Sequence, residues 1–178
     1  MGDPGSLPAR HTTADHIRRA ALADAATTFD GFPAVEWVRA TGVSVSETIS
    51  TWQLGRLASL PVGVAWDVVR LPHPEGWEVV RHMRANAEQL GPVLHTAAGV
   101  DFLVPVGSAD TWDLPGASVL GHGEQLLVPT PSVVAPHTQD SRTWIVAPRP
   151  EPVLADAAYL YGAYAAATSV MGIARGER

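Results

Sequence analysis

The hydrophobic pattern of the chain contains an apolar run over residues 62–72, which ends at Pro72 and holds one carboxylate, Asp67, and one guanidinium, Arg70. A run of this length, rich in β-branched residues, predicts a strand that is buried on both faces. A buried strand rarely carries a charge unless that charge has a partner or a function. Asp67 and Arg70 lie three positions apart, so their side chains are expected on opposite faces, each with its own partner. For Asp67 we expect an ion pair elsewhere in the fold.

Apolar positions at helical spacing predict helices before and after this strand. A capping box formed by Ser44 and Glu47 indicates one helix start, and Asp156 is a suitable N-cap for a closing helix. The predicted helices cover about residues 13–29, 33–42, 44–57, 74–91 and 156–173. The expected core stripe of the fourth helix is Trp77, Val80, Met83, Ala87 and Leu90. That of the last helix is Leu160, Tyr161, Tyr164, Thr168 and Met171.

Shorter apolar runs predict the remaining strands. They cover residues 93–96, 100–104, 118–120, 125–128 and 143–146. Residues 97–99 are expected to turn the first two into a hairpin, and the Gly-His-Gly segment 121–123 is expected to be a hairpin turn between the next two. The first strand, the helix after it and the next strand make a βαβ-like unit. The pattern therefore predicts an α/β (α+β) fold, a mixed sheet with flanking helices.

The expected domain organisation is one domain that follows a short tail. Residues 1–11 hold glycines and prolines without periodic apolar positions, so we expect a flexible tail there. Residues 12–178 are expected to form a single domain, long enough to bury a sizeable core. Its parts are a helical N-terminal portion over 12–58, a sheet core over 60–147 and a C-terminal helix over 156–173.

Composition and charge narrow the functional classes. The formal net charge is −6, and all 12 basic side chains are arginine. A protein that binds nucleic acid mainly through phosphates usually has a basic surplus, so such binding here would depend on a local arginine patch. The absence of cysteine excludes disulfides and thiolate metal sites. With no apolar stretch of membrane-spanning length and no signal-peptide pattern, we expect a cytoplasmic protein without membrane contact.

Common catalytic and metal-binding motifs are missing from the chain. The seven histidines are scattered, with no HExxH sequence and no pair at i and i+4, so the spacing predicts no metal site and no cofactor. The nucleophile elbow GxSxG, the P-loop and the GxGxxG turn are also absent. The six tryptophans are widely spaced, which favours core anchors over stacking platforms for bases.

Two stretches of the chain resemble a known family. Residues 119–132 (VLGHGEQLLVPTPS), followed by a loop and then Arg142-Thr-Trp144, are similar to the end of the prim-pol domain of archaeo-eukaryotic-type primases. The strand Ala65-Trp-Asp-Val-Val69 resembles the first catalytic strand of that family, and the intervening helix and hairpin follow in a compatible order. The resemblance covers about residues 60–147 and is closest to short, stand-alone actinobacterial proteins of the primase/polymerase-like type.

The resemblance implies a metal-dependent site that this chain has largely lost. Prim-pol domains join nucleotides on a template, and their acidic residues hold the divalent ions that the reaction requires. Asp67 stands at the first acidic position, whereas Val69 and Val119 stand at the other two. The histidine motif near the hairpin is also absent, since His95 and Asp101 have the wrong spacing. Valine cannot bind magnesium, so we expect an inactive domain.

The expected function is therefore that of an accessory or regulatory binding protein. Its ligand would be nucleic acid, a nucleotide or a protein, in a cleft around Asp67, Arg70, His95 and His122. One alternative is an active nucleotidyl transferase, in which Asp101, His122 and Glu124 rebuild an Mg²⁺ or Mn²⁺ site with Asp67. Another is a protein-interaction module that uses the proline-rich loop 129–141 or the C-terminal helix as its contact surface. The oligomeric state does not follow from the sequence.

Overall fold

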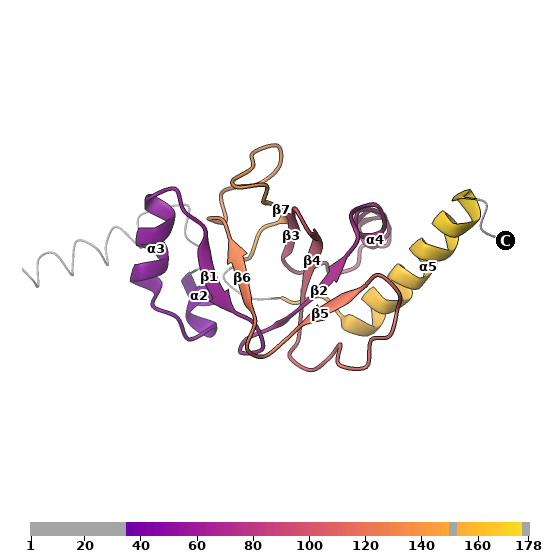
Figure 1. Ribbon diagram of the computed structural model, residues 1–178, viewed down its shortest axis with the longest axis horizontal. Coiled ribbons are helices and arrows are strands. Elements are labelled where there is room, and N and C mark those ends of the chain that lie inside the picture. The colour runs from indigo at the N-terminus through magenta and orange to yellow at the C-terminus, as the bar shows by residue number, and fades with distance from the viewer. Residues whose placement is uncertain (1–34, 150–152, 176–178) are drawn as a thin grey trace, which may run out of the picture. The chain divides into compact units, whose positions relative to one another are not determined.

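The structure, a computed structural model, describes residues 35–149 and 153–175. The tail predicted for residues 1–11 and the helix predicted for residues 13–29 lie outside this part of the chain. The described residues belong to one compact unit (Figure 1). None of its helices is long and apolar enough to cross a membrane.

A five-stranded sheet forms the centre of this unit, and its strand order is β5-β2-β4-β3-β7. Each neighbouring pair is antiparallel. The strands are β2 (Asp67–Leu71), β3 (Val93–Thr96), β4 (Gly99–Val104), β5 (Ser118–Leu120) and β7 (Thr143–Val146). Because β2 and β3 are both antiparallel to β4, which lies between them, they are parallel to each other. The predicted βαβ unit is thus confirmed, with β4 inserted into its centre. A separate two-stranded ribbon pairs β1 (Ala58–Pro61) with β6 (Gln125–Val128).

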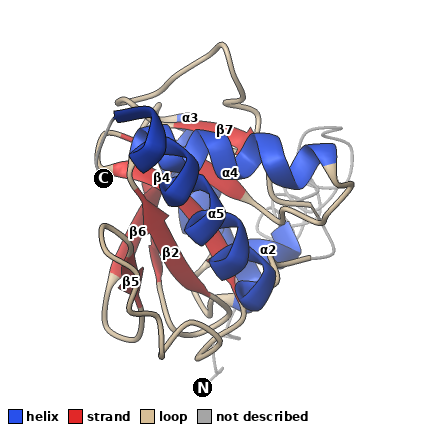
Figure 2. Cartoon of the chain, turned by 90° about the vertical axis from the view of Figure 1, so that its right-hand side faces the viewer, coloured by secondary structure: helices blue, strands red, loops and turns tan. Residues whose placement is uncertain are grey.

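Two helices cover one face of the five-stranded sheet. Figure 2 shows α4 (His73–Ala85) and α5 (Ala157–Arg175) lying in front of the strands. Side chains from every second position of β2 and β4 pack against these helices, and the buried set includes Val69, Leu71, Val79, Met83, Val100, Phe102, Leu160 and Tyr164. A buried Val, Leu or Phe side chain contributes about 1.5–3 kcal/mol, so this layer is a major source of stability.

The opposite face of the sheet is covered by a second apolar layer built around tryptophans. Trp37 in α2 (Val35–Ala40) stacks on Trp66, with ring centroids 5.9 Å apart, and meets Trp144 of β7 edge-on at 5.7 Å. In α3 (Val45–Gln53), the Trp52 indole donates a hydrogen bond to the carbonyl of Val128 in the ribbon. The dispersed tryptophans of this layer are core anchors, as their spacing predicted.

The predicted strand over residues 62–72 is divided in the structure. The prediction of burial on both faces is confirmed for β2, but the chain between Pro61 and Asp67 is a loop. Gly63 in this loop has φ of +80°, and a Cβ there would lie 2.4 Å from the backbone of His122. The positive φ and the close contact between the two loops both require glycine, and a positive φ is incompatible with a continuous strand. The strand β1 comes just before this loop and was not predicted from the hydrophobic pattern.

Of the two predicted hairpin turns that contain glycine, one is confirmed and the other is wrong. Thr96 pairs with Gly99 across the β3–β4 hairpin, as expected. The turn over residues 121–123 does not close a hairpin, because β5 belongs to the five-stranded sheet and β6 to the ribbon. It carries the chain from one sheet to the other. Pairing between strands that are far apart in the sequence depends on tertiary packing, and the residues of a local turn do not determine it.

Helix ends and buried faces also differ from the prediction. The helix α3 ends at Gln53 rather than near Leu57, and α4 ends at Ala85 rather than at Gly91. Trp77 is 42% exposed, whereas the buried positions of α4 are Glu75, Gly76, Val79, Val80 and Met83. The physical reason is the close approach of Gly76 to Val100, which turns the neighbouring Trp77 away from the sheet. In α5, three alanines join Leu160 and Tyr164 on the buried face; they are Ala157, Ala163 and Ala167.

We expect Gly76→Ala to destabilise the fold. A Cβ at this position would lie 2.6 Å from Cβ of Val100. The overlap should outweigh the gain of about 1 kcal/mol in helix propensity and lower the free energy of unfolding by about 1–3 kcal/mol. The control is Gly162→Ala in α5, which meets no atom within 4 Å and should stabilise by up to about 1 kcal/mol. Urea unfolding measures both, and equal effects in the two variants would contradict close packing at Gly76.

Candidate functional site

Asp67 is buried at the start of β2, beneath two loops. It pairs in register with Val104 and is only 3% exposed. Its Oδ2 atom accepts a hydrogen bond from the backbone N–H of Gly107 at 2.7 Å. Its Oδ1 atom has no hydrogen-bond partner among the described residues and lies close to Gly121. The prediction of an ion pair for Asp67 is wrong for the described part of the chain, where no ion pair includes this residue. The backbone amide of Gly107 is its hydrogen-bond partner instead.

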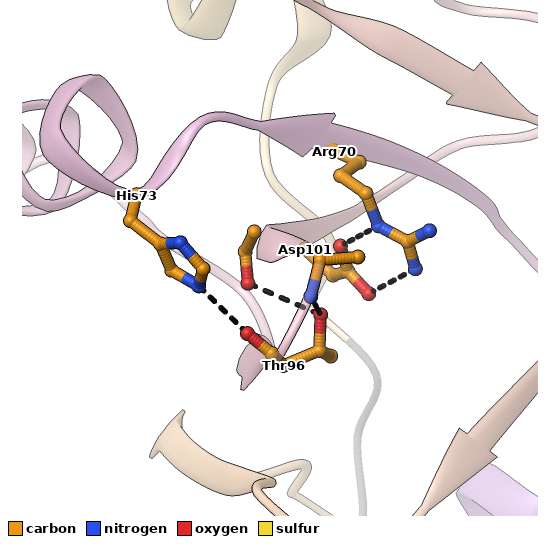
Figure 3. A network of polar contacts seen from close by, with 6 residues as sticks. Arg70, His73, Thr96 and Asp101 are labelled. Atoms are coloured by element: carbon orange, nitrogen blue, oxygen red, sulfur yellow. Dashed lines mark hydrogen bonds and ion pairs between the residues drawn. The ribbon is translucent and has the colours of Figure 1, made fainter.

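Arg70 lies on the opposite face of β2 from Asp67 and pairs with Asp101 of β4. The Arg70 side chain donates two parallel hydrogen bonds to the carboxylate, Nε to Oδ1 at 2.7 Å and Nη2 to Oδ2 at 2.8 Å (Figure 3). Asp101 is fully buried, whereas 27% of the Arg70 side chain is exposed. The hydrogen bonds to Asp101 raise the pKa of Arg70 further above its ordinary value, against the opposing effect of burial. Such a bidentate pair keeps both charges satisfied inside the fold.

The tip of the β3–β4 hairpin allows this ion pair to form. Gly99 adopts φ of +157°, and a Cβ there would lie 2.4 Å from the carbonyl oxygen of Leu71 and 3.1 Å from Cγ of Arg70. Glycine therefore lets the stem of Arg70 cross the hairpin to reach Asp101. The hydroxyl of Thr96 supports the turn, because it donates to the carbonyl of Gly99 and accepts from the N–H of Ala98.

His95 lies in β3, at the other end of the sheet from Asp67. It pairs in register with Val100, while Asp67 pairs with Val104, and four residues of strand span roughly 13 Å. The His95 ring lies 4.8 Å from that of His73 and 6.0 Å from that of Trp77, measured between centroids. Burial lowers the pKa of His95, and the neighbouring His73 lowers it further, against a smaller opposing effect of Asp101.

His122 is exposed in the turn between β5 and β6. Glu124 closes this turn, since its carboxylate accepts a hydrogen bond from the N–H of Gly121 at 2.8 Å. The N–H of Glu124 donates in turn to the carbonyl of Gly121. Glu124 is thereby a structural residue of the turn, and the backbone of His122 lies against Gly63.

The four residues predicted to share one cleft do not lie together. Asp67 and His122 belong to one end of the sheet, His95 to the other, and Arg70 points from the opposite face. The rearranged metal site of the alternative prediction is also not assembled, because Asp101 is bound to Arg70. Over the described ranges 35–149 and 153–175, no group of three or more metal-binding side chains occurs.

The structure contains two features that the sequence did not indicate. One is the cluster of His73, His95 and Trp77, which joins α4 to β3 and has no spacing signal in the chain. The other is a pocket of about 440 Å³ between the end of α4 and the segment after β7. The pocket contains none of the predicted site residues, and its lining includes Arg84, Leu90, Ile145, Ala147 and Arg149.

We expect Arg70→Gln to cost about 3 kcal/mol of stability, because it leaves the buried carboxylate of Asp101 without its charged partner. The matched control is Arg81→Gln on α4, whose side chain is 74% exposed and pairs with Glu78 at the surface. A surface pair contributes little, so this change should stay within about 0.5 kcal/mol. Urea unfolding measures the free energy of unfolding of both variants. If Arg70→Gln lowers it no more than Arg81→Gln does, the ion pair does not contribute the expected stability.

Comparison of the chain with known protein families, with curated proteins and with solved structures finds no significant match. The resemblance to prim-pol domains therefore stays a prediction that rests on the quoted residues. The fold class, in contrast, is visible directly as an antiparallel five-stranded sheet, a two-stranded ribbon and flanking helices.

Proposed function

We propose that this chain is a catalytically inactive prim-pol-like domain that acts by binding, as an accessory or regulatory protein. The observation that carries the proposal is the pairing of Val69 with Val119. These are the two positions at which the resemblance expects metal-binding carboxylates. They lie directly opposite each other in the register of β2 and β5, and both belong to the apolar layer beneath the helices. Two valines in this place give a divalent ion no ligand.

Asp67 does not compensate for the two valines. It is 3% exposed, and the N–H of Gly107 already occupies its Oδ2 atom. Mg²⁺ in nucleotidyl-transfer sites keeps several waters and needs carboxylates that reach it together with substrate phosphates. A single buried carboxylate held by a backbone amide supports a structural role better than a catalytic one.

The ligand we propose first is nucleic acid or a nucleotide, which is the class implied by the resemblance. A protein ligand is the second candidate, and a specific observation favours it. Two of the large apolar side chains that remain exposed are Val134, at 39%, and Val170, at 61%. They belong to the loop 129–141 and to α5, the two segments expected to supply a contact surface for protein. Exposed apolar residues are common singly, so this observation ranks second.

The direct test is template-dependent nucleotide incorporation with Mg²⁺ or Mn²⁺. We expect the wild-type chain to incorporate no more nucleotide than Asp67→Asn, a variant that keeps the shape of the side chain and an acceptor for Gly107. An active prim-pol enzyme in the same reaction shows that the conditions permit synthesis. Metal-dependent incorporation that Asp67→Asn abolishes would overturn the proposal in favour of an active transferase.

The same preparation distinguishes the two ligand classes. Binding to a fluorescent single-stranded oligonucleotide should weaken steeply with salt, because phosphate contacts release counterions. Binding to a protein through apolar side chains should change little over the same range of salt. Saturable, salt-sensitive oligonucleotide binding supports nucleic acid as the ligand, and the absence of such binding at low salt rules nucleic acid out.

A further inference from the structure

Two imidazole rings from different elements lie against each other beside an exposed indole. His73 begins α4, and His95 lies in β3 on the sheet face that α4 covers. Their ring centroids are 4.8 Å apart with an interplanar angle of 39°. Trp77, one turn along α4, is 42% exposed and its ring lies 6.0 Å from that of His95. Neither element alone contains such a pair of histidines.

The hydrogen bond of His73 determines which of its nitrogens is free. Nε2 lies 2.7 Å from the carbonyl oxygen of Thr96 (Figure 3), and a carbonyl can only accept, so Nε2 carries the proton. In the neutral ring, Nδ1 therefore presents its lone pair. Metal-binding histidines commonly donate their other N–H to a backbone carbonyl in this way, which fixes both tautomer and ring orientation.

His95 makes no hydrogen bond with its buried ring nitrogen in the described part of the chain. Its Nδ1 atom is buried without a hydrogen-bond partner among the described residues. Its ring lies against that of His73, which leaves this nitrogen beside a second imidazole. A buried polar atom without a partner indicates that a ligand or water belongs beside it.

The separation of the rings fits a shared metal ion. A nitrogen–zinc distance of about 2.0–2.1 Å places the centre of an imidazole roughly 3.2 Å from the ion. Two rings bound at angles from square to tetrahedral then have centres about 4.5–5.2 Å apart, and the observed 4.8 Å lies in this range. Packed aromatic rings occupy similar distances. The uncommitted nitrogens therefore carry more weight than the distance.

We propose that His73 and His95 form a binding site for a divalent transition metal ion, with Zn²⁺ and Cu²⁺ preferred and water in the remaining coordination positions. Imidazole suits these ions, whereas Mg²⁺ and Ca²⁺ prefer oxygen ligands. A third histidine or carboxylate does not join the pair within the described residues, which leaves open positions on the ion. The site lies away from Asp67 and is independent of the proposed function.

The test is calorimetric titration of the full-length, tag-free chain with Zn²⁺ at neutral pH. His11 and His16 are replaced by Gln throughout, so that the N-terminal segment contributes no imidazole. We expect one site, and at least a tenfold loss of affinity in His95→Gln and in His73→Gln. The matched control is His122→Gln, an exposed histidine in the β5–β6 turn, which should leave the affinity unchanged. Equal affinity in all of these variants, or no saturable binding, would overturn the proposal.

Trp77 provides a second readout that does not depend on a histidine variant. Cu²⁺ bound between the two rings would lie close to the indole and quench its fluorescence. We expect saturable quenching that is largely lost in Trp77→Phe, while that variant still binds Zn²⁺. Quenching that persists undiminished in Trp77→Phe would place the ion elsewhere and overturn the site. Unfolding midpoints measured without metal show whether each variant is folded. If His73→Gln is unfolded, the metal affinity of His95→Gln alone tests the site.

Discussion

The central constraint of this structure is that the two middle strands, β2 and β4, are buried on both faces. All six residues of β4 and four of the five in β2 are buried. The chain must therefore build two apolar layers, one from α4 and α5 and one from the tryptophans with α2, α3 and the ribbon. Every polar group on these strands must find its partner inside the protein.

Two of the three charged residues of these strands meet this constraint fully, and Asp67 meets it through one of its two carboxylate oxygens. Arg70 and Asp101 satisfy each other across neighbouring strands, on the face that carries the tryptophans. Asp67 points to the helix side and is held by a backbone amide of the loop that follows β4. A charge on a buried strand suggests an active site when only the sequence is known. Here the geometry gives two of the three charges an ion pair and the third a hydrogen bond.

For the histidines, the structure indicates a site where the sequence predicted none. Their spacing predicted no metal site, since no two of them share a helix face or a tight turn. The fold places the first residue of α4 beside a residue of β3, because Leu71 at the end of β2, Val100 of β4 and His95 of β3 stand in one register across the sheet. A carbonyl of the hairpin then orients one of the two rings. The proposed metal site is thus a product of tertiary structure, while the proposed loss of catalysis rests on positions found in the sequence.

Hydrophobic periodicity by itself determined the type and order of nearly all the described elements, because burial of one face imposes a period of 2 or 3.6 residues. The Ser44 and Asp156 caps mark helix starts for the same local reason, since each side chain accepts a hydrogen bond from the backbone N–H three positions on. No local sequence pattern shows which strands or which charged side chains will pair. Only the tertiary structure decided that β5 and β6 belong to different sheets, that Gly76 turns Trp77 outward, and that Asp101 pairs with Arg70. These outcomes depend on contacts between distant residues, which the chain acquires only when its two apolar layers pack.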